Sequence, residues 1–500
     1  MEAATPSQDE MKLRVARSVK WNAIDKIASM VLYSVTGIVL ANVVPREDFG
    51  LVGAVAVFQA FAALFVDSGF SSALIQKKRV DKLDYSSVFW FNLSVSAILY
   101  VVLFLAAPWI AEFYQGDERL IPISRVMFLT FILNALAIVQ TNRLMKRMDM
   151  KMITVSNTLG LIVSSLAAIW MALAGWGAWA LVWQAIILAA VKAAILWSTG
   201  KWVPLLKMSW SSLRSFFRVG SGMMGGSFLN ILFRNIYTII IGHRAGILPL
   251  SYYTQADKWS TMGISSLSAM LTQSFLPALS EYQDDEKKFA SSTAKMNRLT
   301  AYILFPVTTL LIVSAGALFH TLFETKWDDS VILFQLLLFR GVFTVLQAVY
   351  NNYILALGKA RLIVATEFMR DIAAIIAIVI TWGYIAIEKP DDVVYGITIL
   401  LWGQIVASFL TWAVTLVISA RLSKRPSLQY LSDLVPYAIL SLIAIIPSVM
   451  IRDFITQPLL LVVTQILLGG LIYMGLSYLS GSKIQSDVLG YIFSVFNKKK

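Results

Sequence analysis

Long apolar runs alternate with short polar connectors along the whole chain. A run of about 20 apolar residues is the length that an α-helix needs to cross the hydrocarbon core of a bilayer. Backbone polar groups in lipid must be satisfied within the segment, so such runs are predicted to be helices. The fourteen runs are residues 21–44, 49–66, 87–107, 121–141, 154–174, 176–197, 216–241, 259–279, 299–320, 330–357, 361–386, 393–420, 435–451 and 459–480.

The composition excludes a soluble protein. Of the 500 residues, 58% are hydrophobic and only 14% are charged, with a mean hydropathy of +0.71. Soluble domains have about 45–50% apolar and about 25% charged residues. The same values exclude a disordered chain. The sequence therefore predicts an all-α polytopic membrane protein with about fourteen transmembrane helices.

A weak internal repeat relates the first two runs to the seventh and eighth. Residues 38–52 can be laid on residues 239–253, with Pro45 matching Gly246 at the turn between the helices. Transporters often contain two such halves with the substrate site between them. We therefore expect two pseudo-symmetric six-helix lobes and two further helices. The expected segments are a basic tail (1–20), the first lobe (21–197), a linker (198–215), the second lobe (216–420), the last two helices (435–480) and a C-terminal tail (481–500).

Positive charge is distributed unevenly between alternate connectors. Of the 42 Lys and Arg residues, 29 fall on the side of the N-terminus, seven on the other side and six within the spans. Cytoplasmic loops of membrane proteins carry an excess of these residues. The pattern predicts a multi-pass protein with both termini in the cytoplasm. It also explains the net charge of +13 without a nucleic-acid partner.

The sequence offers no catalytic constellation or metal site. There are no cysteines, and the two histidines, His243 and His320, lie in no metal or triad motif. The connectors hold at most about twenty residues, so neither face carries a soluble domain. These features predict a protein that is not an enzyme and that needs no cofactor or metal.

Polar and charged residues at helical spacing within three spans mark a candidate cavity. A charge in the bilayer core costs at least about 2.5–3.5 kcal/mol on insertion scales, and such residues usually face a cavity. Arginine presents a planar fork that fits phosphate oxygens. We therefore expect a basic cavity that takes an anionic head group, best a phosphate or pyrophosphate. The alternative is that these residues have a structural role and form hydrogen bonds between helices. The candidate residues are Lys26 in the first span, Asn230, Arg234 and Tyr237 in the seventh, and Arg340, Gln347 and Asn351 in the tenth.

Acidic residues within the spans are candidates for coupling to an ion. Asp25 is either a cation or proton site or the partner of Lys26. Glu367 and Asp371 flank Arg370 in the eleventh span, close enough for mutual neutralisation, so a structural pair is the alternative to ion coupling. Lys192, near the cytoplasmic end of the sixth span, is expected to extend its ammonium toward the membrane surface.

Several segments resemble bacterial exporters of polysaccharide repeat units. They are residues 41–53 (ANVVPREDFGLVG), 66–78 (VDSGFSSALIQKK), 89–92 (FWFN), 107–114 (APWIAEFY), 175–182 (GWGAWALV), 251–253 (SYY), 275–285 (FLPALSEYQDD) and 326–327 (KW). In combination they are similar to the Wzx-type, colanic-acid-exporter-like branch of the multidrug/oligosaccharidyl-lipid/polysaccharide export superfamily. The resemblance covers about residues 12–380.

The resemblance implies a fold and a task. The fold is the two-lobed arrangement of multidrug (MATE) transporters and lipid II flippases. The task is to move an undecaprenyl-pyrophosphate-linked oligosaccharide, a repeat unit of O-antigen, capsule or exopolysaccharide, from the inner to the outer leaflet. In the family, charged residues of the first helix line the central cavity. The pair Asp25-Lys26 stands where relatives often show Glu-Arg, and lysine lacks the bidentate fork.

Alternating access driven by H+ or Na+ or by the membrane potential is the expected mechanism, because the chain has no ATP-binding motif. Glycosyltransferases or a polymerase of polysaccharide synthesis are further expected partners. One alternative function is a multidrug or cation antiporter of the same superfamily, which predicts an acidic cavity. The other is a membrane glycosyltransferase or polymerase, which predicts a long exterior loop and convergent acidic residues.

Overall fold

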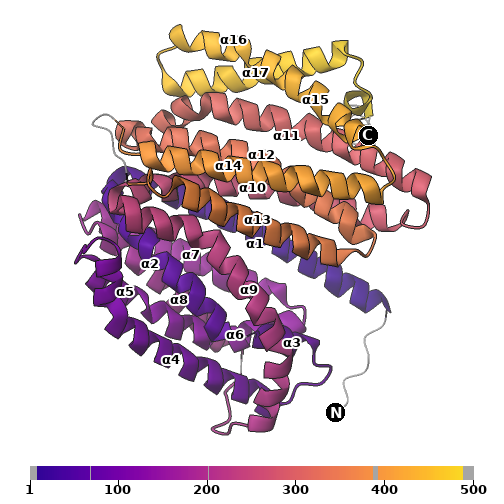
Figure 1. The fold of residues 1–500 in the computed structure, drawn as a ribbon. Helices are drawn as coiled ribbons and strands as arrows, with labels where there is room; N and C mark the ends of the chain where they lie inside the picture. The colour runs from indigo at the N-terminus through magenta and orange to yellow at the C-terminus, as the bar shows by residue number, and fades with distance from the viewer. Residues whose placement is uncertain (1–7, 68, 201, 387–391, 488–500) are drawn as a thin grey trace, which may run out of the picture. The chain divides into compact units, whose positions relative to one another are not determined.

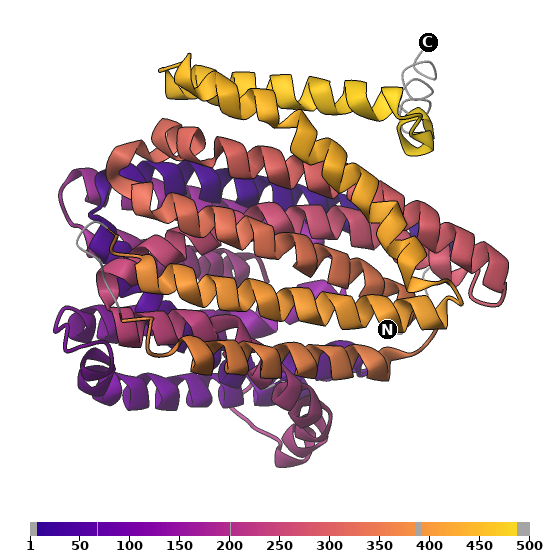
Figure 2. The same cartoon turned by 45° about the horizontal axis from the view of Figure 1, so that its top comes forward.

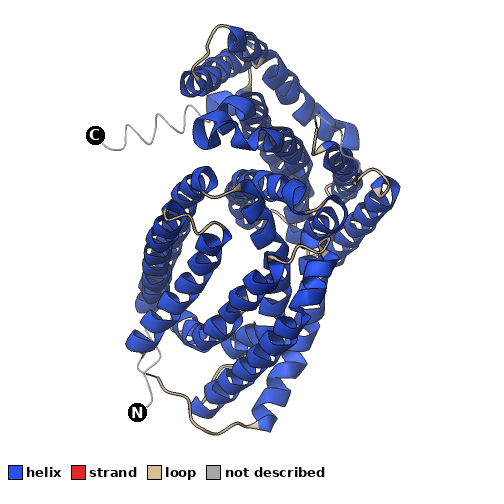
Figure 3. Ribbon diagram, turned by 90° about the vertical axis from the view of Figure 1, so that its left-hand side faces the viewer, coloured by secondary structure: helices blue, strands red, loops and turns tan. Residues whose placement is uncertain are grey.

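The computed structural model describes residues 8–67, 69–200, 202–386 and 392–487, and every regular element within these ranges is helical (Figure 3). Parts of the two predicted tails, residues 1–7 and 488–500, lie outside them. The chain divides into two compact units, Met1–Ser251 and Tyr252–Lys500. They are called the N-unit and the C-unit, and each is described by itself.

The described residues of the N-unit form nine complete helices and the start of a tenth (Figure 1). Helix α7 packs against both α1 and α8, and α6 packs against α4 and α8. Helix α9 packs mainly along α2. The helices are α1 (Gln8–Val43), α2 (Arg46–Asp67), α3 (Phe70–Gln76), α4 (Lys82–Phe113), α5 (Leu120–Met127), α6 (Leu129–Lys146), α7 (Met150–Leu173), α8 (Ala178–Gly200) and α9 (Trp210–Ala245).

The C-unit is built around α11 and α12. Helix α11 packs against α12, α15 and α17, while α14 packs against α12 and α13. The C-terminal helices α15, α16 and α17 lie together, as Figure 2 shows in yellow and orange. The helices are α10 (Ile247–Ser280), α11 (Glu286–Phe323), η1 (Glu324–Trp327), α12 (Asp328–Ala356), α13 (Ala360–Thr381), α14 (Tyr395–Leu422), α15 (Ser427–Ala444), α16 (Ile446–Met450), η2 (Ile451–Asp453) and α17 (Pro458–Leu479).

The predicted all-helical, multi-pass architecture is confirmed. Eleven helical stretches in the described ranges are long and apolar enough to cross a membrane, and one of them, Glu286–Ala356, contains both α11 and α12. Helices α10 and α13 are not among these stretches. Polar side chains in α10 and four charged residues in α13 lower the hydropathy of these two helices. The count of fourteen spans therefore stays a prediction that agrees with the helix order.

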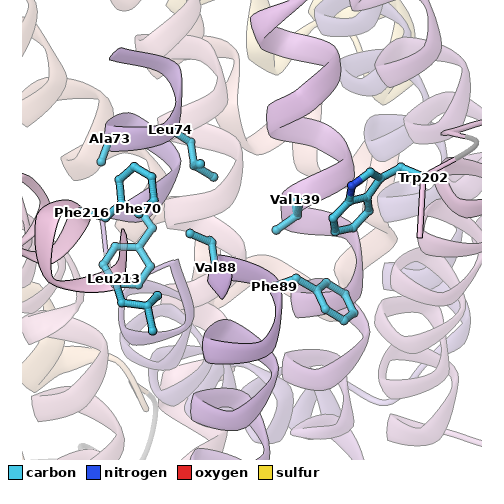
Figure 4. Packing of buried hydrophobic residues seen from close by; sticks show 9 residues of the cluster. All are labelled: Phe70, Ala73, Leu74, Val88, Phe89, Val139, Trp202, Leu213 and Phe216. Carbon is cyan, nitrogen blue, oxygen red and sulfur yellow. The ribbon is translucent and has the colours of Figure 1, made fainter. Parts of the chain in front are cut away.

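A buried apolar cluster packs the start of α9 against other helices of the N-unit. It joins residues of α3, α4, α6 and α9 with Trp202, which follows α8 (Figure 4). Nearby, the indole Nε1 of Trp90 donates a hydrogen bond of 2.8 Å to the carbonyl oxygen of Leu205. The segment after α8 is thus fixed to α4, and burial of the cluster holds the start of α9 in place. The cluster residues are Phe70, Ala73, Leu74, Val88, Phe89, Val139, Trp202, Leu213 and Phe216.

Gly50 marks a close approach of α2 to the start of α10 within the N-unit. A Cβ atom at this position would lie 2.2 Å from the carbonyl oxygen of Ile247. A backbone atom cannot move aside as a flexible side chain can, so a larger residue would push the helices apart. Overpacking of this kind usually costs about 1–3 kcal/mol.

We therefore expect Gly50→Ala to lower the thermal unfolding temperature of the purified protein. Gly475→Ala in α17 is the control, because a Cβ there would meet no atom within 4 Å. Alanine has a higher helix propensity than glycine, so the control variant should be neutral or slightly more stable. Equal unfolding temperatures for Gly50→Ala and the wild type would show that the two helices do not approach as described.

Candidate functional site

The candidate carboxylate of the first helix, Asp25, is hydrogen-bonded to a residue of another helix. Asp25 of α1 is half-buried, and its two carboxylate oxygens accept hydrogen bonds of 3.3 and 3.4 Å from the Asn157 amide of α7. Lys26 is exposed. Within the described residues no ion pair joins the two neighbours, because Asp25 faces α7. The structure therefore favours Asn157 over Lys26 as the partner of Asp25.

Helix α9 presents the candidate residues of the seventh span along a glycine-rich stretch. Asn230 lines a hollow of about 570 Å³ together with Gly222, Gly226, Ser227 and Ile231. One turn further, the Arg234 side chain is exposed and has no ion pair or hydrogen bond in the described part of the N-unit. Tyr237 lies deeper and is only 4% exposed. The helix thus presents the unneutralised guanidinium of Arg234 near a surface that small residues keep open.

In the C-unit, candidate residues of α12 and α13 meet. The side-chain amides of Gln347 and Asn351 each donate a hydrogen bond of 3.4 Å to the Oε1 atom of Glu367. The Arg370 guanidinium forms ion pairs with Glu367 and, at 3.0 Å, with Asp371. The expected mutual neutralisation in α13 is confirmed, and it includes two amides from the neighbouring helix.

Arg340 lies further along α12 and stands apart from that network. It is half-buried, and its Nε atom has no hydrogen-bond partner among the described residues. A buried guanidinium nitrogen without a partner loses its hydration without compensation. Arg340 is therefore a cation that an anionic ligand would stabilise.

Arg340→Lys tests what this guanidinium contributes. The substitution keeps the charge but removes the planar fork. If Arg340 acts by attracting an anion, we expect partial transport activity, about a tenth to a half of the wild-type rate, with unchanged insertion into the membrane. Transport rates in reconstituted vesicles, normalised to protein content, provide the measurement. Full activity would make the guanidinium geometry irrelevant at this position.

The candidate residues thus fall into two groups. Asp25, Lys26, Asn230, Arg234 and Tyr237 lie in the N-unit, whereas Arg340, Gln347, Asn351, Glu367 and Asp371 lie in the C-unit. The structure brings Gln347, Asn351 and Glu367 into contact, and it pairs Asp25 with a residue that was not a candidate. A common cavity lined by the first, seventh and tenth spans stays a prediction.

The sequence analysis missed a polar cavity inside the N-unit. This cavity has a volume of about 730 Å³ and is lined by α1, α2, α3, α6, α7 and α8. Its polar lining includes Gln59, Asn134, Asn142, Asn157 and Lys192. The available signal was the recurrence of Asn, Gln and Thr in spans without strong charges. That signal was weak, because each such residue alone is equally typical of hydrogen bonding between helices.

The two histidines take part in packing and in a surface contact. His243 stacks on Phe113, with ring centroids 4.3 Å apart, and its Nδ1 lies 2.7 Å from the Phe113 carbonyl oxygen. His320 Nε2 lies 2.7 Å from a carboxylate oxygen of Asp328. His243 lies in the N-unit and His320 in the C-unit.

Residues 39–332 match the family described as polysaccharide biosynthesis protein. The matched region covers more than half of the chain.

Curated relatives that are named as biosynthesis proteins match about 70% of the chain. The lipopolysaccharide biosynthesis protein WzxC of Escherichia coli is 25% identical over 72% of this chain and 73% of its own length. The teichuronic acid biosynthesis protein TuaB of Bacillus subtilis is 23% identical over 70% of this chain and 72% of its own length. The succinoglycan biosynthesis transport protein ExoT of Rhizobium meliloti is 23% identical, with 72% of each chain covered.

Solved structures of transporters share the fold. The inward closed conformation of the lipid II flippase MurJ aligns with a TM-score of 0.69 at 13% identity, covering 91% of this chain and 98% of that chain. An inward-facing MATE multidrug transporter aligns with a TM-score of 0.57 at 17% identity, covering 79% and 96%. The predicted likeness to lipid II flippases and MATE transporters is therefore confirmed at the level of the fold.

Proposed function

This chain belongs to the family of polysaccharide biosynthesis proteins, and we propose on that basis that it flips lipid-linked oligosaccharides across the membrane. The cargo would be an undecaprenyl-pyrophosphate-linked repeat unit of O-antigen, capsule or exopolysaccharide. Movement would run from the cytoplasmic to the outer leaflet. The family and the shared fold are those of transport proteins, so the chain is a transporter and not an enzyme.

The observation that carries this proposal is unneutralised positive charge on membrane helices. Arg234 of α9 and Arg340 of α12 each lack an ion-pair partner among the described residues of their own units. Charge-assisted bonds from a guanidinium to a phosphate group are among the strong hydrogen bonds of proteins. Binding of a pyrophosphate head group would therefore offset the free-energy cost of placing these charged side chains in the membrane.

A second feature supports ion-coupled movement. The chain carries carboxylates within its spans, at Asp25 in the N-unit and at Glu367 and Asp371 in the C-unit. In a cycle of alternating access, binding or release of H+ or Na+ at such a carboxylate would shift the balance between the two open states. Asp25 is the better candidate, because its described partner is a neutral amide, whereas Arg370 already neutralises the other two.

The antiporter alternative fits the charges less well. A cavity that attracts cationic drugs should present unpaired acidic groups within the spans. Among the described residues, the charged groups without an ion pair within the predicted spans 216–241 and 330–357 are arginines. The alternative of a membrane glycosyltransferase or polymerase would need convergent acidic residues on a long exterior loop. The described connectors between helices are short.

The protein is a multi-pass membrane protein. We place it in the bacterial inner membrane with both termini in the cytoplasm, because 29 of its Lys and Arg residues fall on that side. There it would receive the repeat unit from the last glycosyltransferase and release it to a polymerase on the outer face.

Deletion of the gene in its bacterium tests this proposal. We expect lipid-linked repeat units to accumulate, and we expect an impermeant glycan-modifying reagent added to spheroplasts to leave them unmodified. Expression of the wild-type chain should restore their modification. Accumulated repeat units that are modified equally with and without the protein would contradict the flippase function. Restored export of a cationic dye in place of the repeat units would favour the antiporter.

A further inference from the structure

The cavity of the N-unit is large enough for a small ligand. Its volume of about 730 Å³ lies within the range of about 300–1,000 Å³ that small-molecule sites occupy. All its lining residues belong to the N-unit, so its geometry is independent of the C-unit. Neither of the candidate arginines, Arg234 and Arg340, is among its lining residues.

The cavity wall carries side chains of the types that commonly bind carbohydrates. Asn134 reaches the cavity from α6, Gln59 from α2 and Asn157 from α7, and each bears a side-chain amide. An amide both donates and accepts, which matches the hydroxyl groups of a sugar. The rings of Tyr33 and Phe131 add apolar surface for the faces of a sugar ring.

Several of these groups are free to bind a ligand. The side chain of Asn134 has no hydrogen bond among the described residues, and the same holds for the Lys192 ammonium. The Gln59 amide nitrogen donates to the Met127 carbonyl oxygen at 3.2 Å and to the Thr130 hydroxyl at 2.9 Å, which leaves its own oxygen available. The wall is thus partly fixed by its own bonds and partly unsatisfied.

Lys192 is the one cation among the residues that line the cavity, and neither Asp67 nor Asp25 forms an ion pair with it. Asp67 also lines the cavity, but its carboxylate accepts hydrogen bonds from the backbone and the hydroxyl of Ser71. Asp25 lies near enough to attract the Lys192 ammonium electrostatically, but it forms no ion pair with it and is held by Asn157. The ammonium therefore faces a polar space and has no ion-pair partner in the part of the N-unit that the structure describes.

We propose that this cavity binds an acidic sugar of the oligosaccharide cargo, with Lys192 pairing with the sugar carboxylate. The inference rests on the proposed function, which supplies an oligosaccharide, and it adds a site and a preference for a charged sugar. The amides would bind the ring hydroxyls, while the lysine would select for a carboxylate. A single ammonium on a flexible stem suits one carboxylate and lacks the planar fork with which arginine grips phosphate groups.

Binding to the purified full-length protein in nanodiscs tests the proposal without any translocation step. The probes are a trisaccharide that contains one glucuronic acid, the same trisaccharide with glucose in that place, and inorganic pyrophosphate. Titration calorimetry should show that the wild type binds the acidic trisaccharide about tenfold more tightly than the neutral one, which is the lower end expected for a charged hydrogen bond.

Three variants and one control make the result specific. Lys192→Gln should remove the preference for the acidic probe and leave the affinity for the neutral one unchanged, whereas Lys192→Arg should retain the preference. Asn134→Ala should weaken both trisaccharides equally. The control is Lys258→Gln, the same change on α10 of the C-unit, which should alter neither affinity.

Three results would overturn the proposal. These are no binding of the acidic trisaccharide to the wild type, an unchanged preference in Lys192→Gln, and a Lys192-dependent affinity for pyrophosphate that equals or exceeds that for the acidic sugar. The last result would assign the cavity to the lipid head group. The proposed function fails separately: Lys192-dependent sugar binding without flipping would leave the site intact and refute the flippase, whereas flipping without it would refute the site alone.

Discussion

Arg234→Ala is expected to abolish translocation of a lipid-linked oligosaccharide while leaving the protein folded in the membrane. The side chain is exposed on α9 and has no ion-pair partner in the described part of its unit, so its removal breaks no structural contact. An alanine at this position is also easier to insert into a bilayer than an arginine. If the guanidinium holds the pyrophosphate, loss of a bidentate charged contact should lower the flipping rate about a hundredfold or more.

The matched control is Arg234→Lys, which keeps the charge and removes the fork. We expect a rate between those of the wild type and the alanine variant. Protein yield and thermal unfolding temperature should be equal for all three proteins. Normal transport by Arg234→Ala at normal yield would show that the head-group site lies elsewhere.

Asp433→Asn is expected to destabilise the C-unit strongly. The Asp433 side chain is 7% exposed and forms ion pairs with Arg298, at 2.8 Å, and with Arg425, whose side chain is only 10% exposed. The guanidinium of Arg425 also lies over the ring of the buried Tyr430. Removal of the shared carboxylate would leave buried positive charge without compensation, which typically costs about 3–5 kcal/mol.

Thermal unfolding of the purified variants measures this loss. The control is Glu286→Gln, which breaks the ion pair between Glu286 and Lys424, whose side chains are 66% and 68% exposed. Exposed pairs contribute about 0–1 kcal/mol, so the control should unfold close to the wild type. Equal unfolding temperatures for Asp433→Asn and Glu286→Gln would contradict a structural role for the buried network.

The fold could be predicted from the sequence because the backbone polar groups of a segment in lipid must form hydrogen bonds within that segment. Apolar runs of sufficient length have to be helical, and most predicted runs fall mainly within one helix of the structure. Two runs are divided between two helices: residues 121–141 between α5 and α6, and residues 435–451 between α15 and α16. The helix ends were harder to predict, since helices extend beyond the lipid. Helix α1 begins at Gln8 and α11 at Glu286, well before the apolar runs that start at residues 21 and 299. Polar and basic residues are good helix formers outside the bilayer as well.

The candidate site could be predicted only in part. Helical spacing placed Glu367, Arg370 and Asp371 on one helix, close enough for the contacts that the structure shows. Contacts between helices were beyond reach, because spacing along one helix says nothing about the facing helix. The pairing of Asp25 with Asn157 and the place of Lys192 in a cavity wall both depend on such packing.

Translocation in proteoliposomes tests the central claim most directly. The purified protein would be reconstituted with a fluorescent polyprenyl-pyrophosphate oligosaccharide, and protection of the glycan from an impermeant modifying reagent would be followed with time. We expect protein-dependent loss of protection that responds to an imposed ion gradient or membrane potential and is absent with Arg234→Ala. Protection of the native repeat unit that persists with folded, reconstituted wild-type protein would contradict the flippase function.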